Sequence, residues 1–222
     1  MIIVALPAYN EGRYIEDMVT EAKKYADEVI VVDDGSTDDT AQLAELAGAT
    51  VVSHSKNEGY GATIISILDE AKKRGLDVLV IIDADTQHNT DDIPCLVKPI
   101  LDGYDLAIGS RKRKDIPPYR YVGGKVLSVL TRILSGVNVS DSQSGFRSFS
   151  PKAVMELELK EKGMAVSSEI IFEAAKRNLK IIEVPISVKY TRDGSTINPV
   201  VQGFYTLWRI IMMAKRRALW RM

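Results

Sequence analysis

Residues 78–88 read VLVIIDADTQH, an apolar run that leads directly into two carboxylates one residue apart. A short run rich in β-branched residues predicts a buried strand. Runs of this kind alternate with helical patterns along the first half of the chain: the runs span 2–6, 29–32 and 106–108, and the helical patterns about 11–26, 38–47, 60–74 and 90–102. This alternation predicts an α/β fold with a doubly wound, mostly parallel sheet.

Polar residues follow each of these predicted strands, in clusters that span 7–11, 33–36, 83–87 and 110–113. Doubly wound sheets bind their ligands outside the carboxyl ends of the strands. The four clusters therefore predict a single ligand site at that edge of the sheet.

The second half of the chain is less regular. A basic segment with prolines and glycines at 111–124 predicts an exposed loop. Beyond it we expect helices near 122–135, after Ser150 and near 167–177, a polar turn at 141–150, a strand at 180–188 and a last helix from about 200.

The composition excludes several classes of protein. The 222 residues include 29 Lys and Arg against 30 Asp and Glu, and the net charge of -1 predicts no general attraction to nucleic acid. The single cysteine, Cys95, excludes an intramolecular disulfide and is expected to be a small buried side chain. The chain starts without a basic leader and has no apolar run of about 20 residues, so we expect neither an export signal nor a membrane-spanning helix.

Asp83 and Asp85 are the main candidates for metal binding. They place concentrated negative charge at the mouth of a buried strand, where a divalent cation can compensate it. Mg²⁺ and Mn²⁺ take oxygen ligands and use only one or two carboxylates when they also bridge to phosphate. Acidic pairs also cap helices and decorate loops, which is the alternative. His88 is expected to be a loop histidine without a ligand role.

A second carboxylate pair, Asp33 and Asp34, follows the second predicted strand. A carboxylate there can accept a hydrogen bond from a base or from ribose hydroxyls. The alternative, which is compatible with the first, is that Ser36 or Thr37 caps the next helix. Neither GxGxxG nor GxxxxGK[ST] occurs near these strands, which argues against a dinucleotide cofactor and against a P-loop.

Five motifs together resemble the family-2 glycosyltransferases, which have the GT-A fold. They occur in the family's order: LPAYNEG at 6–12, VVDDGSTD at 31–38, NEGYGA at 57–62, IDADTQH at 82–88 and IGSR at 108–111. With DSQSGFR at 141–147 and a basic motif at 192–196, the chain is similar to dolichyl-phosphate mannose synthases and to polyprenyl-phosphate glucose or N-acetylglucosamine synthases. The resemblance implies one GT-A domain at 1–199, with a nucleotide-sugar half at about 1–110 and an acceptor half at about 111–199.

The resemblance also implies roles for individual residues. Those expected around the nucleoside are Pro7, Tyr9, Glu11, Val32 and Asp34, and those around the metal and diphosphate are Asp83, Ala84, Asp85 and Gln87. The metal is expected to be Mg²⁺ or Mn²⁺, held by Asp83, Asp85 and Gln87. Arg111 and Arg192 are expected to meet phosphate, with Arg120 as a third candidate, because guanidinium groups pair with phosphate oxygens bidentately. The alternative for Arg111 and Arg120 is a solvated basic loop.

The implied function is inverting transfer of a hexose from a nucleotide-diphosphate sugar to dolichyl or polyprenyl phosphate. A phosphate monoester has a second pKa near about 6, so this nucleophile needs no protein base. Asp85, Arg111 and Arg192 are then the expected catalytic residues. Thr196 stands where mannose synthases have a lysine, which favours a UDP-hexose or UDP-N-acetylhexosamine over GDP-mannose.

Two rival functions are kept. A family-2 transferase that acts on a sugar hydroxyl would need a base, for which Glu169 is the candidate, with an ordinary helix-face glutamate as the alternative. The second rival is a non-catalytic nucleotide-sugar binding module.

Residues 200–222 combine apolar and aromatic residues at helical spacing with several arginines and lysines. Such a helix is typical of segments that lie in a membrane interface. We therefore expect a cytoplasmic protein associated peripherally with the cytoplasmic membrane face. The alternative is a helix packed on its own core or on a partner in an oligomer.

Overall fold

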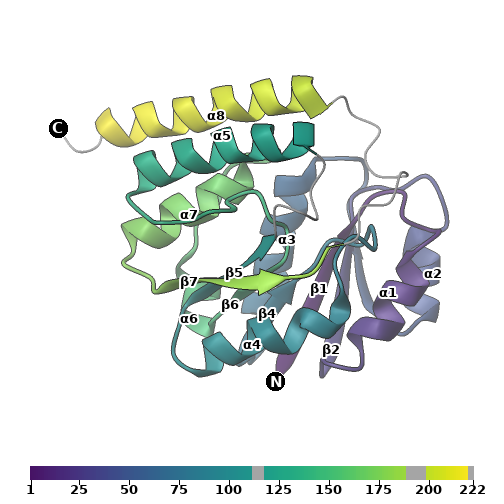
Figure 1. Ribbon diagram of the computed structural model, residues 1–222. Coiled ribbons are helices and arrows are strands. Elements are labelled where there is room, and N and C mark those ends of the chain that lie inside the picture. The colour runs from purple at the N-terminus through teal and green to yellow at the C-terminus, as the bar shows by residue number, and fades with distance from the viewer. Residues whose placement is uncertain (112–117, 189–198, 220–222) are drawn as a thin grey trace.

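A seven-stranded sheet lies at the centre of the molecule, with helices on both faces (Figure 1). The computed structural model describes residues 1–111, 118–188 and 199–219. In the order in which they lie in the sheet, the strands are β3 (Thr50–Ser53), β2 (Glu28–Asp33), β1 (Ile2–Ala8), β4 (Val78–Ile81), β6 (Arg147–Phe149), β5 (Leu106–Arg111) and β7 (Ile181–Ile186). Among these described strands, only β6 runs antiparallel to its neighbours, which confirms the predicted mostly parallel α/β sheet.

Two hydrophobic clusters cover the two faces of the sheet. On β1, Ile3 and Ala5 belong to one cluster and Val4 and Leu6 to the other, because successive side chains of a strand point to opposite faces. The first face is covered by α3 (Tyr60–Lys72), α6 (Pro151–Glu156) and α7 (Val166–Lys176). The second is covered by α1 (Ile15–Ala22), α2 (Thr40–Leu46) and α4 (Ile93–Leu101), with a 3-10 turn at Thr90–Asp92 before α4.

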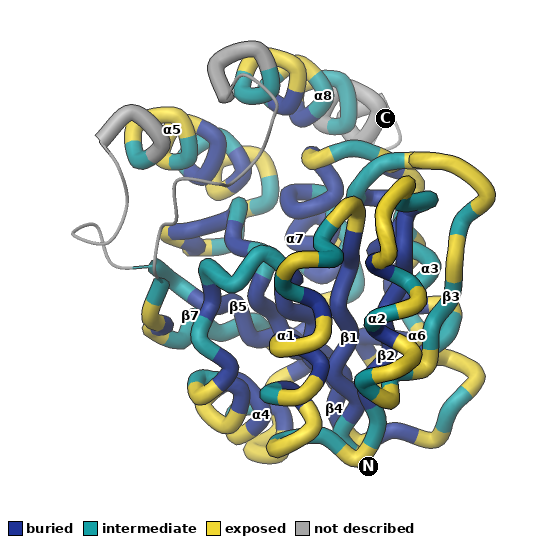
Figure 2. Tube along the Cα trace, turned by 90° about the vertical axis from the view of Figure 1, so that its right-hand side faces the viewer, coloured by how far each residue is buried: buried dark blue, intermediate teal, exposed yellow. Residues whose placement is uncertain are grey.

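Two long helices form an additional layer outside α7. These are α5 (Pro118–Ser135) and α8 (Pro199–Leu219), and they lie side by side in both views (Figures 1 and 2). Leu127 of α5 and Ile210 of α8 pack against Phe172 of α7 in a small separate cluster. The layer therefore contacts the body of the protein through this apolar cluster and through polar contacts such as the Thr131–Ser168 hydrogen bond at 2.8 Å.

The predicted polar turn at 141–150 is wrong for its last part. Residues 147–149 form β6, which lies in the interior of the sheet between β4 and β5. The strand has only three residues and begins with a buried arginine, so it has no apolar run that would reveal it. The edge strand β3 was also missed, because its residues are only half-buried or exposed.

Three smaller expectations also need correction. The exposed loop predicted at 111–124 is wrong for its last part, because α5 begins at Pro118. The first helix is shorter than the predicted 11–26, because residues before Ile15 belong to the loop that follows β1. Cys95 is exposed on α4 rather than buried.

Candidate functional site

The residues Asp83, Ala84 and Asp85, here called the DAD motif, begin a tight turn at the carboxyl end of β4. Thr86 has φ of 59°, a left-handed conformation that β-branched residues rarely adopt. The backbone N–H of Gln87 donates to Oδ1 of Asp85 at 3.0 Å, which holds that carboxylate within the turn. Ala84, between the two carboxylates, is buried.

Asp83 is oriented by neighbours from other parts of the chain. The Tyr60 hydroxyl donates to its Oδ1 at 3.0 Å, and Nε2 of His88 lies 3.7 Å from its Oδ2. Burial alone would raise the pKa of Asp83, but His88, Tyr60 and the positive charge of Arg111 hold it below its usual value. Asp83 is therefore held ionised.

Gly145 lies directly against this carboxylate. A Cβ at Gly145 would stand 2.1 Å from Oδ2 of Asp83, far inside van der Waals contact. Only glycine therefore lets the 141–147 segment approach Asp83 so closely.

The remaining carboxylates crowd negative charge at this edge. Burial and the charge of Asp83 raise the pKa of Asp85. Burial, followed by the charges of Asp85, Asp38 and Asp83, raises the pKa of Glu11 to about 7. Such shifts indicate a site with more negative charge than the protein itself compensates.

This donor set fits a divalent cation shared with phosphate. In the described part of the chain, no three His, Cys, Asp or Glu side chains are grouped as a complete metal cage. Mg²⁺ and Mn²⁺ at nucleotide sites use one or two carboxylates and complete their coordination with phosphate oxygens and water. Asp83 and Asp85 supply such a pair, and Gln87 follows in the same turn.

His88 is a buried residue of the loop that follows β4. Its ring packs against Phe146 with centroids 5.4 Å apart, and its backbone forms an isolated antiparallel bridge with Val188. Among the described residues its Nδ1 atom has no hydrogen-bond partner. The residue thus connects the DAD turn to the end of β7, and its only described contact with a carboxylate is the long one to Asp83.

Arg111 brings positive charge to the same edge, at the end of β5. Its Nε and Nη2 donate to the two carboxylate oxygens of Asp141, at 2.6 and 2.8 Å. The loop that carries Asp141 is held in turn, because the backbone N–H groups of Ser140 and Asp141 donate to Oε1 of Glu183 at 2.8 and 3.0 Å. The guanidinium is thus fixed by side chains from two other segments.

A buried arginine organises the loop between these groups. Arg147 is 3% exposed and donates to three main-chain carbonyls, those of Ser144, Ser167 and Ser142, at 2.8, 2.9 and 2.8 Å. Burial lowers its pKa to about 10, so it remains charged at neutral pH. Arg147 therefore fixes the 141–147 segment, which carries both the aspartate that holds Arg111 and the glycine against Asp83.

Asp34, predicted to contact the nucleoside, is buried with its oxygens already engaged. Its Oδ1 accepts from the backbone N–H of Glu58 at 2.9 Å and lies 2.7 Å from Nδ1 of His54. Its Oδ2 accepts from the N–H of Gly59 at 2.9 Å. A carboxylate offers about four acceptor positions, so these three contacts leave room for one more.

The other predicted nucleoside residues lie around the ends of β1 and β2. Pro7 and Val32 are paired in register and are both buried, whereas Tyr9 is exposed. The backbone N–H of Glu11 donates to Oγ1 of Thr40 at 2.8 Å. These positions are close together at one edge, and their contact with a nucleoside stays a prediction.

The expected helix cap after β2 is wrong. The Ser36 hydroxyl donates to the Asp33 carboxylate, and the Thr37 N–H donates to Oδ1 of Asn10 at 2.8 Å. The helix α2 begins at Thr40, without a side-chain cap. These residues instead join the loops that follow β1 and β2.

The side chain of Glu169, the candidate base, points toward the loop at 160–163. Its carboxylate accepts hydrogen bonds from the N–H of Lys160, at 3.1 and 3.0 Å, and from that of Glu161, at 2.8 Å. Burial raises its pKa.

Two predicted phosphate ligands cannot be placed. Arg192 and its basic motif at 192–196 lie outside the described residues, and so does the side chain of Arg120. Sequence reasoning also missed Tyr60, Asp141, Gly145 and Arg147 as site residues. The signal was present, since all four fall within the NEGYGA and DSQSGFR motifs, but no role could be read from the letters alone.

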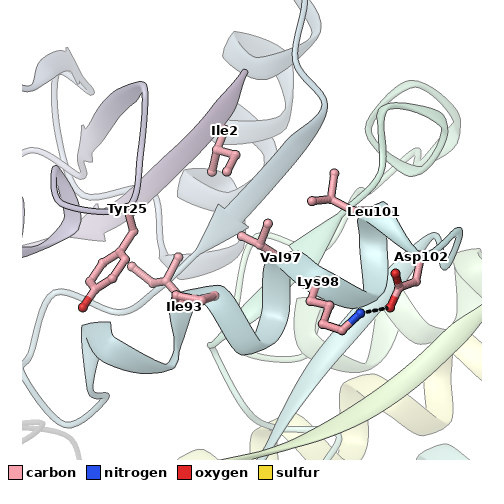
Figure 3. A pocket seen from close by; sticks show the side chains of 8 residues that line it. Ile2, Tyr25, Ile93, Val97, Lys98, Leu101 and Asp102 are labelled. Atoms are coloured by element: carbon pink, nitrogen blue, oxygen red, sulfur yellow. Dashed lines mark hydrogen bonds and ion pairs between the residues drawn. The ribbon is translucent and has the colours of Figure 1, made fainter.

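An apolar hollow of about 330 Å³ lies away from this edge, between α4 and the start of β1 (Figure 3). Ile2, Val97 and Leu101 contribute to its lining, together with the Lys98–Asp102 ion pair at 2.7 Å. None of the predicted site residues lines it.

Comparison with known proteins identifies relatives of this chain. The family model for glycosyl transferase family 2 matches residues 3–157. The UDP-N-acetylglucosamine–dolichyl-phosphate N-acetylglucosaminyltransferase of Methanococcus voltae is 34% identical over 99% of this chain and 98% of that protein. The polyprenol monophosphomannose synthase of Mycolicibacterium smegmatis is 31% identical over 83% of this chain and 76% of that protein.

The fold matches a solved structure as well. The glucosyl-3-phosphoglycerate synthase of Mycobacterium tuberculosis, in complex with Mn²⁺, uridine diphosphate and glucosyl-3-phosphoglycerate, has a TM-score of 0.75 and 25% identity. The match covers 95% of this chain and 79% of that one.

Proposed function

Because the chain belongs to glycosyl transferase family 2, we propose that it transfers a hexose from a nucleotide-diphosphate sugar to a dolichyl or polyprenyl phosphate. The observation that carries the proposal is that acidic side chains and an arginine lie at the same carboxyl edge of the sheet. The carboxylates of Asp83 and Asp85 follow β4, and Arg111, paired with Asp141, is the last residue of β5. Two anionic reactants, a diphosphate and a lipid phosphate, need both kinds of group.

The carboxylates form the donor side. Asp83 and Asp85, with Gln87, would hold Mg²⁺ or Mn²⁺, and Tyr60 would keep Asp83 turned toward it. The cation would supply charge neutralisation to the departing diphosphate. The proposed nucleoside contacts are Pro7, Tyr9, Glu11, Val32 and Asp34.

The arginines form the acceptor side. Arg111 is held by Asp141 and would bind and orient the lipid phosphate, and Arg192 and Arg120 are proposed as further phosphate ligands. The phosphate monoester is already anionic near neutral pH, so the protein needs to hold it in line rather than deprotonate it. A single displacement at the anomeric carbon predicts inversion.

The hydroxyl-acceptor rival depends on a free base. The three hydrogen bonds that Glu169 accepts from the N–H groups of Lys160 and Glu161 require its carboxylate as a loop anchor. This engagement favours the phosphate acceptor over the hydroxyl.

The outer helices support contact with a membrane. Among the described helices, none is both long enough and apolar enough to cross a bilayer. Yet α5 and α8 expose large apolar side chains at helical spacing: Val122, Val126 and Ile133 on α5, and Phe204, Trp208 and Ile211 on α8. We propose that this face lies in the headgroup region of the cytoplasmic membrane surface and brings the site to its lipid acceptor.

For the donor, UDP-hexose or UDP-N-acetylhexosamine is proposed, with GDP-mannose as the alternative. One relative is named for UDP-N-acetylglucosamine and another for mannose, and the solved neighbour holds uridine diphosphate. These names support a nucleotide-diphosphate sugar as the donor, and they differ in the sugar.

The test is release of nucleoside diphosphate from a panel of UDP- and GDP-sugars with Mn²⁺, with and without dolichyl phosphate in vesicles. We expect release that requires both the metal and the lipid phosphate. Nucleotide binding without lipid-stimulated release would favour the hydroxyl-acceptor transferase or the binding module.

A further inference from the structure

The outer helix α8 is tied to the body of the protein by an ion pair. Nε and Nη2 of Arg209 lie 2.8 and 2.6 Å from Oε2 of Glu161. Glu161 is only 3% exposed, so its carboxylate makes this contact largely shielded from solvent. The position of Arg209 on α8 therefore constrains the loop that carries Glu161.

That loop contacts the start of α3 closely. The carbonyl of Lys162 accepts from the N–H groups of Gly61 and Ala62 at 2.8 and 3.3 Å. A Cβ at Gly61 would lie 2.1 Å from the carbonyl oxygen of Glu161, and a Cβ at Gly59 would lie 2.6 Å from that of Lys162. Because the contact is backbone against backbone with no side chain between, a shift of the loop displaces the start of α3.

The start of α3 in turn touches two proposed donor-site carboxylates. Tyr60 donates to Oδ1 of Asp83 at 3.0 Å, and the N–H groups of Glu58 and Gly59 donate to Asp34, both at 2.9 Å. Residues 58–61 thus lie between the loop at 160–163 and the site. A continuous set of contacts leads from α8 to the metal-binding motif.

We propose that Arg209 and Glu161 are positioning residues for the donor site. Through the loop at 160–163 and the start of α3, they fix the Tyr60 hydroxyl that orients Asp83, and so set the affinity for a nucleoside diphosphate with its divalent cation. The inference rests on the proposed function, since it takes Asp83 as a donor-site ligand. The same helix carries the exposed apolar face, so the element proposed to meet the membrane also supports the donor site.

The test uses the full chain and titrates UDP and GDP, each with Mn²⁺, by calorimetry. Tyr60→Phe is expected to raise the Kd about tenfold, the lower end for loss of a group that orients a metal ligand. Arg209→Gln is expected to raise it about threefold to tenfold, and Arg209→Lys to recover most of the loss because it keeps a charge beside Glu161. In the double variant Tyr60→Phe/Arg209→Gln, the increase in Kd should be smaller than the product of the two single increases, because both changes act on Asp83 through the same contacts.

A matched control is available in Arg74. Its Nε and Nη1 pair with Glu28 of β2 and Glu70 of α3 at 3.1 and 2.9 Å, and its side chain is similarly half-buried. Arg74 itself lies just beyond the end of α3 that is remote from Tyr60. Arg74→Gln should leave the Kd within about twofold of wild type even where it lowers Tm as much as Arg209→Gln does.

Several results would overturn the inference. One is a wild-type Kd in Arg209→Gln when Tyr60→Phe has a raised Kd. Another is a double variant whose increase in Kd equals the full product of the two single increases. A Kd change in Arg209→Gln no larger than that of Arg74→Gln would reduce Arg209 to a stabilising residue. A wild-type chain that binds neither nucleotide with Mn²⁺ would instead overturn the proposed function, and this inference with it.

Discussion

The donor and acceptor sides of the site place their charged groups in different ways. Asp83 and Asp85 follow β4 directly, so the sheet itself brings them to its edge. Arg111 is the last residue of a strand, but its guanidinium is directed by Asp141 from a loop that the buried Arg147 holds in place. The comparison teaches that the donor side is built from strand ends, whereas the acceptor side depends on a loop and the side chains that fix it.

The largest effect is expected from Asp85→Asn, which removes a proposed metal ligand from the donor side. Activity should fall by more than about a hundredfold, since even groups behind the ligands cost 10–100-fold. Nucleoside diphosphate release and Mn²⁺ affinity would be measured together. Asp102→Asn, beside the distant hollow, is the control. A normal rate in Asp85→Asn would remove this residue from the mechanism.

Gly145→Ala is expected to have the next largest effect. It tests the contact between the 141–147 segment of the acceptor side and Asp83 of the donor side. The added Cβ would displace Asp83, so we expect Mn²⁺-dependent nucleotide affinity to fall by about thirtyfold. Gly123→Ala serves as the control, because among the described residues no atom outside its own stretch of helix lies within 4 Å of its Cβ position. Equal nucleotide affinity in the two variants would show that the 141–147 segment does not constrain Asp83.

Asp141→Asn should separate the two sides. Loss of the charge that holds Arg111 is expected to raise the KM for the lipid phosphate about tenfold, the cost of a weakened charge-assisted hydrogen bond. The affinity for nucleotide and Mn²⁺ should stay within about twofold of wild type, because Asp141 touches no donor-side carboxylate among its described contacts. An equal loss of lipid-phosphate and nucleotide affinity would mean that the division into a donor side and an acceptor side is wrong.

Trp208→Ala is expected to have the smallest effect, because it alters only the outer layer. Activity on dolichyl phosphate in vesicles should fall about fivefold, which corresponds to roughly 1 kcal/mol of lost apolar burial. Binding of soluble nucleotide should not change, because Trp208 is exposed. Leu46→Ala on α2 is a control for loss of an exposed apolar side chain elsewhere. Unchanged vesicle activity would argue that α8 meets a protein partner or none.

The same contrast decides what the sequence could predict. The strands β1, β2, β4 and β5 are buried on both faces and read as continuous apolar runs, so they and the carboxylates after them were predictable. The strand β6 was not, because Arg147 is buried only by virtue of three carbonyls that come together on folding. An arginine followed by a serine gives no local sign of such a position.

The supporting residues of the site were hidden for a similar reason. Tyr60 and Gly145 act on Asp83 across separations of 23 and 62 residues along the chain, the difference of their residue numbers. No periodicity or spacing reveals such an approach. The resemblance located their motifs, and the three-dimensional contacts were needed to assign a role to each residue.

The most direct test of the central claim is to identify the acceptor atom. The chain would be incubated with Mn²⁺, dolichyl phosphate and UDP-N-acetylglucosamine, UDP-glucose or GDP-mannose in turn, and the lipid analysed by mass spectrometry with Asp85→Asn as the blank. We expect one of these donors to yield a lipid that carries a single sugar through its phosphate, with inverted anomeric configuration. Unmodified lipid phosphate with every donor, alongside sugar transferred to an added hydroxyl acceptor, would contradict the account.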